Sequence, residues 1–205
     1  IQWFQRLSGK DNGTALDIGA GIGKAMTSIG KAGYDVYGIE PGKEFYQMAV
    51  DRMKISPDKL QNVAIEEAQF EEDFFDFITF GAVLEHLYDP SGSIKQALKW
   101  LKPGGLIHIE VPSSKWLVHK LVNLFYKVTG TDFVANLSPM HPPYHLYEFH
   151  PKSFELNGQQ NGYIIKDIGY YVAKTFLPSI IDPIIKPIMK RTDTGMQLVV
   201  WLQKK

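Results

Sequence analysis

The sequence predicts a doubly wound α/β fold, in which helices cover both faces of a mostly parallel sheet. Three observations lead to this prediction. Short apolar runs that suit buried strands alternate with segments whose apolar residues recur at helical spacing. The first apolar run leads through a glycine-rich turn directly into a helical pattern. Glycine, proline and aspartate separate the later segments. Strands that alternate with helices in this way pair in parallel, because each helix returns the chain to the same edge of the sheet.

The composition is that of an ordinary globular chain. With 205 residues, 44% of them apolar, we expect one domain, residues 1–205, with a sizeable core. The 22 basic and 22 acidic residues balance, which argues against a nucleic-acid partner. No apolar run approaches the ~20 residues that span a bilayer, so we expect no stable membrane insertion. The absence of cysteine excludes disulfides and thiolate chemistry and fits a cytoplasmic protein.

The expected elements of the first half follow one another regularly. A helix over residues 43–54 would share one apolar face among Phe45, Met48, Ala49 and Met53. The run from Lys102 to Gly105 is a strong helix stop. Strands are expected near 14–18, 34–39, 62–66, 77–80 and 106–111, and further helices near 1–10, 25–30 and 90–101.

The second half is less regular. After Pro151 we expect a helix, capped by Ser153, that runs to Gly162. Strands should follow at 164–172 and 196–202. Between them, three prolines in residues 177–191 argue against a long regular helix. We interpret this stretch as a packed irregular connection. A hydrophobic rim, a dimer contact and a membrane-touching edge are the alternatives.

The glycine-rich turn, LDIGAGIGK at residues 16–24, selects between two ligand classes. A dinucleotide-binding turn has the pattern G-x-G-x-x-G. In the two possible registers the third glycine would fall at Lys24 or at Met26, so the pattern fails. Asp17 also precedes the first glycine, where a carboxylate would repel a pyrophosphate but suits an ammonium group. We expect positive φ angles in the turn, and backbone N–H groups that face a closely approaching ligand.

A second acid ends the next apolar run. Glu40 follows residues 34–39, at about the spacing where doubly wound folds place an acid on ribose hydroxyls. A carboxylate accepts hydrogen bonds from both hydroxyls of an unphosphorylated ribose. The alternative is a solvated glutamate at the end of a strand.

Several segments, in this order, resemble the class I S-adenosylmethionine-dependent methyltransferases, in particular the type 11, 12 and 23 families. DIGAGIG resembles their first motif, the acid pair at 66–67 their third, and residues 75–90 and 101–113 their fourth and fifth strand segments. The match runs from about residue 14 to 113. It implies a Rossmann-like, seven-stranded sheet, mostly parallel with an antiparallel last strand, and S-adenosyl-L-methionine as the cofactor. The cofactor-binding residues that it carries over are Asp17, Gly19, Ala20, Gly21, Gly23, Glu40, Pro41, Glu67, Ala68 and Gly81. Among these, the resemblance places Glu67 on the adenine amino group and the Ala68 N–H on a ring nitrogen.

The candidate catalytic residues follow the fourth strand. Ligands of open parallel sheets bind beyond the carboxyl ends of the strands, where Glu85 and His86 would lie. Methyl transfer from a sulfonium mainly needs alignment, and a base helps where the acceptor must lose a proton. His86 is the candidate base, and Glu85 would orient it or bind substrate. The alternative is that His86 is structural.

Residues 113–149 interrupt the repeating pattern with a helical stripe and a run rich in proline and histidine. The resemblance implies a substrate-recognition insertion at this point. We interpret it as a lid over the acceptor pocket, between core segments 14–112 and 150–205. The alternative is an added helix packed on the sheet edge. His141, Tyr144 and His145 are the candidate acceptor contacts.

A metal site is not expected. His141 and His145 are four residues apart, the spacing of zinc ligands on a helix, but two prolines separate them and no cysteine is available.

These observations predict methyl transfer to a small molecule, at oxygen in preference to nitrogen, by a monomer or homodimer. No Asn- or Asp-Pro-Pro-Tyr/Phe motif follows the fourth strand, which argues against methylation of nucleic-acid bases. Two alternatives are a methyltransferase-like module that binds the cofactor without catalysis and a nucleotide-dependent oxidoreductase.

Overall fold

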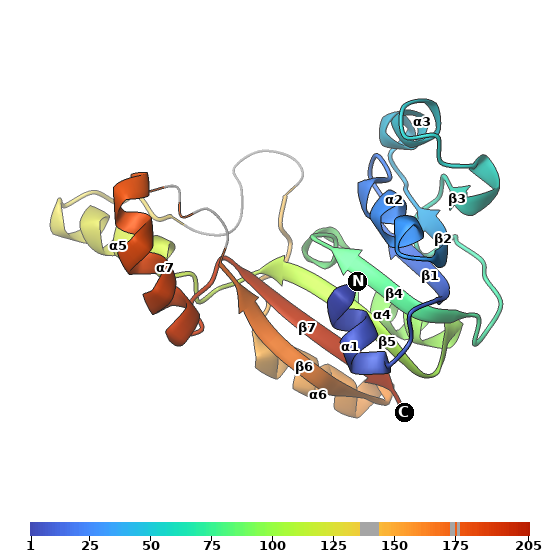
Figure 1. Cartoon of the computed structure of the whole chain (residues 1–205). Coiled ribbons are helices and arrows are strands. Elements are labelled where there is room, and N and C mark those ends of the chain that lie inside the picture. The colour runs from blue at the N-terminus through green and yellow to red at the C-terminus, as the bar shows by residue number, and fades with distance from the viewer. Residues whose placement is uncertain (136–143, 173–174, 176) are drawn as a thin grey trace.

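The computed structural model describes residues 1–135, 144–172, 175 and 177–205 of the chain (Figure 1). The strands are β1 (Gly13–Ile18), β2 (Tyr34–Ile39), β3 (Leu60–Gln61), β4 (Phe75–Gly81), β5 (Leu101–Pro112), β6 (Tyr163–Tyr171) and β7 (Gln197–Lys204). The α-helices are α1 (Gln2–Ser8), α2 (Lys24–Lys31), α3 (Lys43–Asp51), α4 (Pro90–Trp100), α5 (Leu117–Val128), α6 (Pro151–Asn161) and α7 (Asp182–Arg191). Three short 3₁₀ turns are η1 (Pro57–Lys59), η2 (Leu84–His86) and η3 (Ser179–Ile181).

The strands form one seven-stranded sheet in the order β3-β2-β1-β4-β5-β7-β6. The pairs among β1 to β5 are parallel, whereas β7 runs antiparallel to both β5 and β6. The predicted fold class, including the antiparallel last strand, is confirmed. The order changes direction at β1, so the carboxyl ends of β1, β2 and β4 meet at one edge of the sheet, where doubly wound folds bind ligands.

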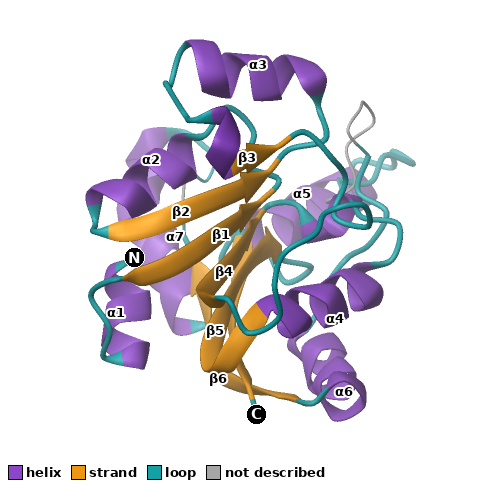
Figure 2. Cartoon of the chain, turned by 90° about the vertical axis from the view of Figure 1, so that its right-hand side faces the viewer, coloured by secondary structure: helices purple, strands orange, loops and turns teal. Residues whose placement is uncertain are grey.

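Helices cover both faces of the sheet, α1 and α2 on one side and α4 and α6 on the other (Figure 2). Successive residues of a strand point to opposite faces, so each strand contributes to two apolar layers. In β4, Phe77 packs on Phe4 of α1 with ring centroids 4.7 Å apart. The next residue, Ile78, belongs to the other cluster, which includes Ile94 and Leu98 of α4. Both layers fix the strand ends that carry the candidate site.

Local predictions were wrong at several points. The third strand is only Leu60–Gln61, and the expected range 62–66 forms a loop and a turn. Helix α3 ends at Asp51, and Phe45 is 53% exposed rather than packed on the inner face. Strand β5 begins directly after α4 at Leu101 and runs through the glycine pair, with an irregular register beside β4.

Two further corrections concern caps and prolines. The N-cap of α6 is His150, whose ring accepts from the Lys152 N–H, and Ser153 completes a capping box with it. The proline-rich stretch forms η3 and the ten-residue helix α7. Pro183 lies in the first turn, where an N–H needs no partner within the helix, whereas Pro187 lies inside α7 and removes one helical hydrogen bond. Among the described residues, no helix has both the length and the apolar character needed to cross a bilayer.

Candidate active site

The glycine turn after β1 is tied to the end of β2. The N–H groups of Gly19 and Ala20 both donate to the Ile39 carbonyl, at 2.8 and 2.9 Å. The Gly21 N–H donates to Glu40 Oε2 at 2.7 Å. The φ angles of Gly19, Gly21 and Gly23 are +72°, +54° and +81°, so the predicted left-handed conformation is confirmed. The N–H groups of residues 19 to 21 thus donate to Ile39 and Glu40, contrary to the expectation that they face a ligand. Cofactor contacts at Gly19, Ala20 and Gly21 remain predictions.

Glu40 is held by the backbone on both sides. Its Oε1 accepts from the Gly42 N–H at 2.7 Å, while Oε2 accepts from Gly21. Asn62 fixes the same tip by donating its Nδ2 to the carbonyls of Glu40 and Pro41, at 2.7 and 3.2 Å. A carboxylate oxygen can accept two hydrogen bonds. Each oxygen of Glu40 accepts one from the backbone, so each can accept one more from a ligand hydroxyl. The arrangement is a preorganised acceptor at the tip of β2.

Asp17 is a buried carboxylate with an unsatisfied oxygen. The residue is 3% exposed, and its Oδ2 has no hydrogen-bond partner in the part of the chain that the structure describes. Burial, and then the charge of Glu40, raise the pKa of Asp17 to about 7. A backbone hydrogen bond from Met26 partly offsets this rise, but a buried carboxylate with one unsatisfied oxygen remains costly. A positively charged ligand at this tip would compensate that cost.

The loop after β4 covers the first glycine. A Cβ on Gly19 would lie 2.4 Å from Cγ2 of Val83, so only glycine allows this packing. Gly81 is exposed at the end of β4, and a Cβ there would meet no atom within 4 Å. The loop therefore links the glycine turn to the catalytic candidates that follow Val83.

Glu85 is buried, whereas the neighbouring His86 is partly exposed to solvent. Glu85 is 1% exposed, its Oε2 lacks a partner among the described residues, and burial raises its pKa. His86 is partly exposed, with its Nε2 3.9 Å from Glu85 Oε1. Its Nδ1 lies 3.0 Å from the Tyr144 carbonyl. Because a carbonyl only accepts, neutral His86 carries its proton on Nδ1 and leaves Nε2 as the basic nitrogen.

The segment after the undescribed residues lies against this turn. The Leu146 N–H donates to the Glu85 carbonyl at 2.8 Å, and Tyr147 Oη donates to the Tyr88 carbonyl at 3.0 Å. The rings of His145 and His86 are 4.9 Å apart. Two of the candidate acceptor contacts, Tyr144 and His145, therefore lie beside the candidate base. The third, His141, lies outside the described residues.

Glu85, His86 and His145 form a cluster that histidine spacing did not predict. Their ligand atoms all lie within 4.8 Å of one another, close enough to hold a divalent cation together. The sequence analysis had considered His145 only with His141, and had rejected that pair because two prolines separate the histidines. The expectation that no metal is needed stays a prediction.

Glu110, a further acid of the site, was missed in the sequence. It lies opposite Gly81 in the β4–β5 register, and its carbonyl accepts from the Ala82 N–H at 2.8 Å. Burial raises its pKa, and its charge contributes to raising the pKa of Glu85. The available signal was an acid near the carboxyl end of the mostly apolar run Leu106–Val111.

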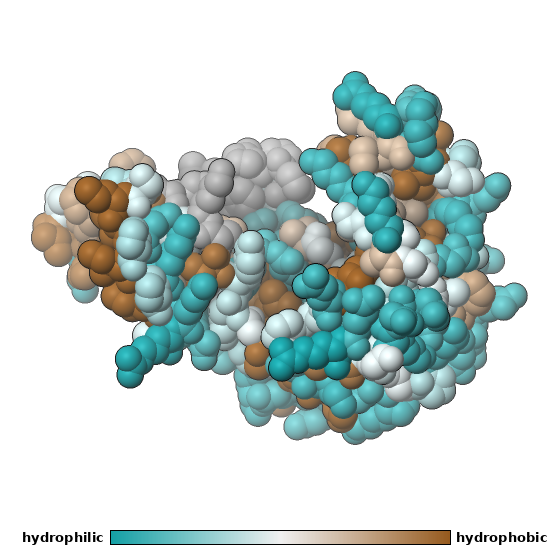
Figure 3. Space-filling model, in the orientation of Figure 1, coloured by the Kyte–Doolittle hydropathy of each residue, from teal (hydrophilic) through white to brown (hydrophobic). Residues whose placement is uncertain are grey.

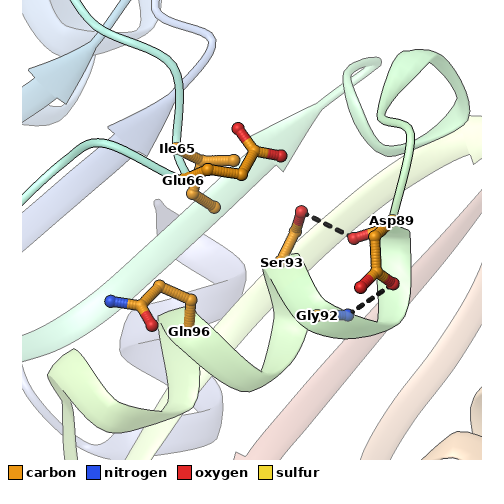
Figure 4. Close-up of a pocket in the computed structure, with 6 residues that line it drawn as sticks. All are labelled: Ile65, Glu66, Asp89, Gly92, Ser93 and Gln96. Atoms are coloured by element: carbon orange, nitrogen blue, oxygen red, sulfur yellow. Dashed lines mark hydrogen bonds between the residues drawn. The ribbon is translucent and has the colours of Figure 1, made fainter.

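The expected adenine contacts lie in the loop before β4. Glu67 is exposed, whereas Ala68 is buried and donates its N–H to the Ala64 carbonyl at 3.1 Å. The preceding residues, Ile65 and Glu66, border a cavity of about 210 Å³ between this loop and the first turns of α4 (Figure 4). Its other lining residues are Asp89, Gly92, Ser93 and Gln96. Cofactor contacts at Glu67 and Ala68 remain predictions.

Comparison with known proteins identifies the class. A family model described as "Methyltransferase domain" matches residues 1–165. The chain therefore belongs to the methyltransferase domain family, and S-adenosylmethionine is its cofactor, as the resemblance implied. A crystal structure of an S-adenosylmethionine-dependent methyltransferase from Mesorhizobium loti has the same fold, with a TM-score of 0.67 at 13% identity over 99% of this chain and 96% of that one.

Two curated relatives are both named ubiquinone biosynthesis O-methyltransferase. The protein of Hydrogenovibrio crunogenus is 27% identical over 175 residues, which cover 82% of this chain and 68% of the relative. The protein of Bordetella avium is 28% identical over 160 residues, which cover 76% of this chain and 64% of the relative. The chain thus spans about two thirds of the length of these relatives.

Proposed function

We propose that this chain transfers the methyl group of S-adenosylmethionine to a hydroxyl oxygen of a small molecule, with His86 as the base. The observation that carries the proposal is the contact of His86 Nδ1 with the Tyr144 carbonyl at 3.0 Å. It leaves Nε2 free to accept a proton from an acceptor hydroxyl. The nearby carboxyl group of Glu85 would stabilise the imidazolium that forms.

The residues at the other strand tips suit this cofactor. Asp17 offers a buried, unsatisfied carboxylate oxygen, which fits a cationic group better than a pyrophosphate. Glu40 offers preorganised acceptors for ribose hydroxyls. When bound, the cofactor supplies an electrophilic methyl group on a positively charged sulfur. The protein's part is to orient both reactants and to take up the hydroxyl proton.

The acceptor class rests on the curated relatives. Their name, ubiquinone biosynthesis O-methyltransferase, favours a hydroxylated quinone precursor over the sugar or secondary-metabolite acceptors that the sequence left open. Tyr144, which is 55% exposed, and His145 would contact such a ring. Of the proposed lid, residues 113–149, the segment from Tyr144 would then form the acceptor-side wall of the site, while residues 136–143 lie outside the described part of the chain.

The test is formation of S-adenosylhomocysteine with a panel of catechol, sugar and amine acceptors. We expect turnover with catechols, and a loss of about 10²–10⁴-fold in His86→Ala at unchanged cofactor affinity. Tyr88→Phe is the matched control, because Tyr88 is two residues away and 88% exposed. Full turnover in His86→Ala would remove the base from the proposal.

The same purified chain separates the two alternatives. Cofactor binding without turnover on any acceptor would favour a non-catalytic module. Calorimetry that shows tighter binding of NAD than of S-adenosylmethionine would favour an oxidoreductase.

A further inference from the structure

Helices α5 and α7 form a pair at the end of the molecule opposite α3 (Figure 1). They share a small apolar cluster of their own, with Trp116 and Val118 on one side and Ile185 and Met189 on the other. Each helix therefore buries one face against the other. Their remaining faces need another explanation.

The second face of α5 is apolar and exposed. Leu121, Leu124, Phe125 and Val128 are 43%, 57%, 62% and 77% exposed. These positions are separated by three and four residues, so they form one stripe along the helix. In a globular protein such a stripe normally faces a core. Here it faces outward.

The α7 side adds a second exposed apolar group. Ile184 and Ile188, one turn apart on the helix, are 68% and 47% exposed. Ile180 in η3 is 83% exposed. Figure 3 shows hydrophobic residues gathered over this end of the molecule. We call these seven residues the apolar tip: Leu121, Leu124, Phe125, Val128, Ile180, Ile184 and Ile188.

The charges around the apolar tip are mostly positive. Helix α5 contains no acid and carries Lys120 and Lys127. Helix α7 ends in Lys190 and Arg191, and the charge of its one acid, Asp182, is paired with Lys186 at 2.7 Å. Lys120, Lys127, Lys190 and Arg191 make no ion pair within the described part of the chain. Two acids that follow the helices, Asp132 and Asp193, also make no ion pair in the described part of the chain. Four free basic groups against these two acids leave a positive surplus beside the exposed apolar residues of a chain whose formal net charge is zero.

We infer that the apolar tip docks the protein on an anionic lipid surface. Exposed leucine, isoleucine and phenylalanine side chains enter the boundary between headgroups and acyl chains, while the lysines and arginine contact lipid phosphates. The chemistry is that of a helix lying on a membrane and not of one that spans it. A second copy of the chain is the less favourable occupant, because two positively charged tips would repel each other. This inference is independent of the methyl-transfer proposal.

Flotation with lipid vesicles tests it. We expect the full chain to bind vesicles of phosphatidylcholine with about 30 mol% phosphatidylglycerol, and to bind pure phosphatidylcholine at least tenfold less. Added salt should release it, since the attraction to the headgroups is screened. Phe125→Asp should lower binding at least tenfold, and Lys127→Gln about fivefold.

Leu156→Asp is the matched control, because Leu156 on α6 is 50% exposed but lies outside the tip. It should bind as the unaltered chain does, and all variants should keep their melting temperature, since the side chains are exposed. No binding to anionic vesicles, or an equal loss in Leu156→Asp, would overturn the inference. So would a stable dimer in sedimentation that Phe125→Asp converts to a monomer, because a second copy would then cover the tip.

Discussion

Each end of the sheet contains a buried aspartate, but only the aspartate at the amino end is paired with charged partners. At the amino end, Asp76 of β4 contacts the ammonium groups of Lys10 and Lys102 at 2.6 and 2.7 Å. Burial alone would raise its pKa, but the hydrogen bonds from both lysines outweigh burial and hold the pKa below its usual range. At the carboxyl end, Asp17 of β1 has an unsatisfied oxygen and a pKa raised to about 7.

The difference separates stabilisation from ligand binding. At the amino end, Lys10 and Lys102 satisfy the Asp76 carboxylate, so this pairing stabilises the folded chain. The carboxyl end leaves Asp17 and Glu85 incompletely paired, and such perturbed acids cluster at functional sites. Four substitutions or conditions test this contrast.

The largest effect is expected at the amino end. Asp76→Asn should lower the free energy of unfolding by about 2–3 kcal/mol, because it removes two charge-assisted hydrogen bonds from a buried site. For a chain of this size that corresponds to roughly 4–12 °C in melting temperature. The stabilisation should be present above the unfolded pKa near 4 and disappear as the pH falls below it, since the folded pKa is lowered.

The control for that substitution is Asp35→Asn. Asp35 forms an exposed pair with Lys59 at 2.8 Å, and such pairs contribute about 0–1 kcal/mol. Equal losses in the two variants, measured by thermal and denaturant unfolding, would contradict the special role of Asp76. Cofactor affinity should stay unchanged in both.

At the carboxyl end, Asp17→Asn should raise the stability of the protein, whereas Asp76→Asn lowers it. The raised pKa means that the folded state binds an extra proton between about pH 4 and 7, so ionised Asp17 destabilises the protein above pH 7. The variant should therefore melt at a higher temperature at pH 8, and no higher below pH 4. We expect it to bind S-adenosylmethionine at least tenfold more weakly by calorimetry. A variant that melts lower and binds normally would show that Asp17 is structural.

The pH dependence of cofactor affinity tests whether Asp17 binds the cofactor in its ionised form. If the ionised carboxylate of Asp17 is the form that binds a cation, affinity should rise up to about tenfold between pH 6 and pH 8. Titrations of Asp17→Asn provide the reference, which should be nearly flat over this range. A slope that survives in the variant would assign the titration to another group.

The smallest effect is expected for Asp89, which lies near the candidate site but whose carboxylate already accepts a hydrogen bond within the chain. Asp89 caps α4 by accepting from the Gly92 N–H at 2.8 Å. Asp89→Ala should lower the free energy of unfolding by about 1 kcal/mol, whereas Asp89→Asn, which keeps the cap, should cost less. Unfolding in urea distinguishes the two. A loss of several kcal/mol would indicate a role beyond capping.

Much of the site could be predicted because it follows from short-range pattern. Strand, glycine turn and helix fixed the location of Asp17, and the next strand fixed that of Glu40, since parallel strands align their carboxyl ends. The role of the turn amides could not be foreseen. Whether an N–H group faces a ligand or the Ile39 carbonyl depends on a neighbouring strand that is distant in sequence.

The prediction was weakest where packing overrides local signals. Three prolines argued against a helix over residues 177–191, yet α7 forms because α5 offers it an apolar face. The prolines between His141 and His145 argued against a histidine pair, but nothing in the sequence indicated that His145 lies beside His86. Glu110 was overlooked because a lone acid in a strand has no periodic signal.

By itself, the sequence determined the alternation of strands and helices in the first half of the chain, the parallel sheet and the acid-bearing tips, because these depend on periodicity, turn residues and composition within short windows. Only the tertiary structure decided which tip groups are already satisfied, that Glu85, His86 and His145 meet, and that α5 and α7 leave an apolar face outward. Those features depend on contacts between segments far apart along the chain. No local pattern encodes them.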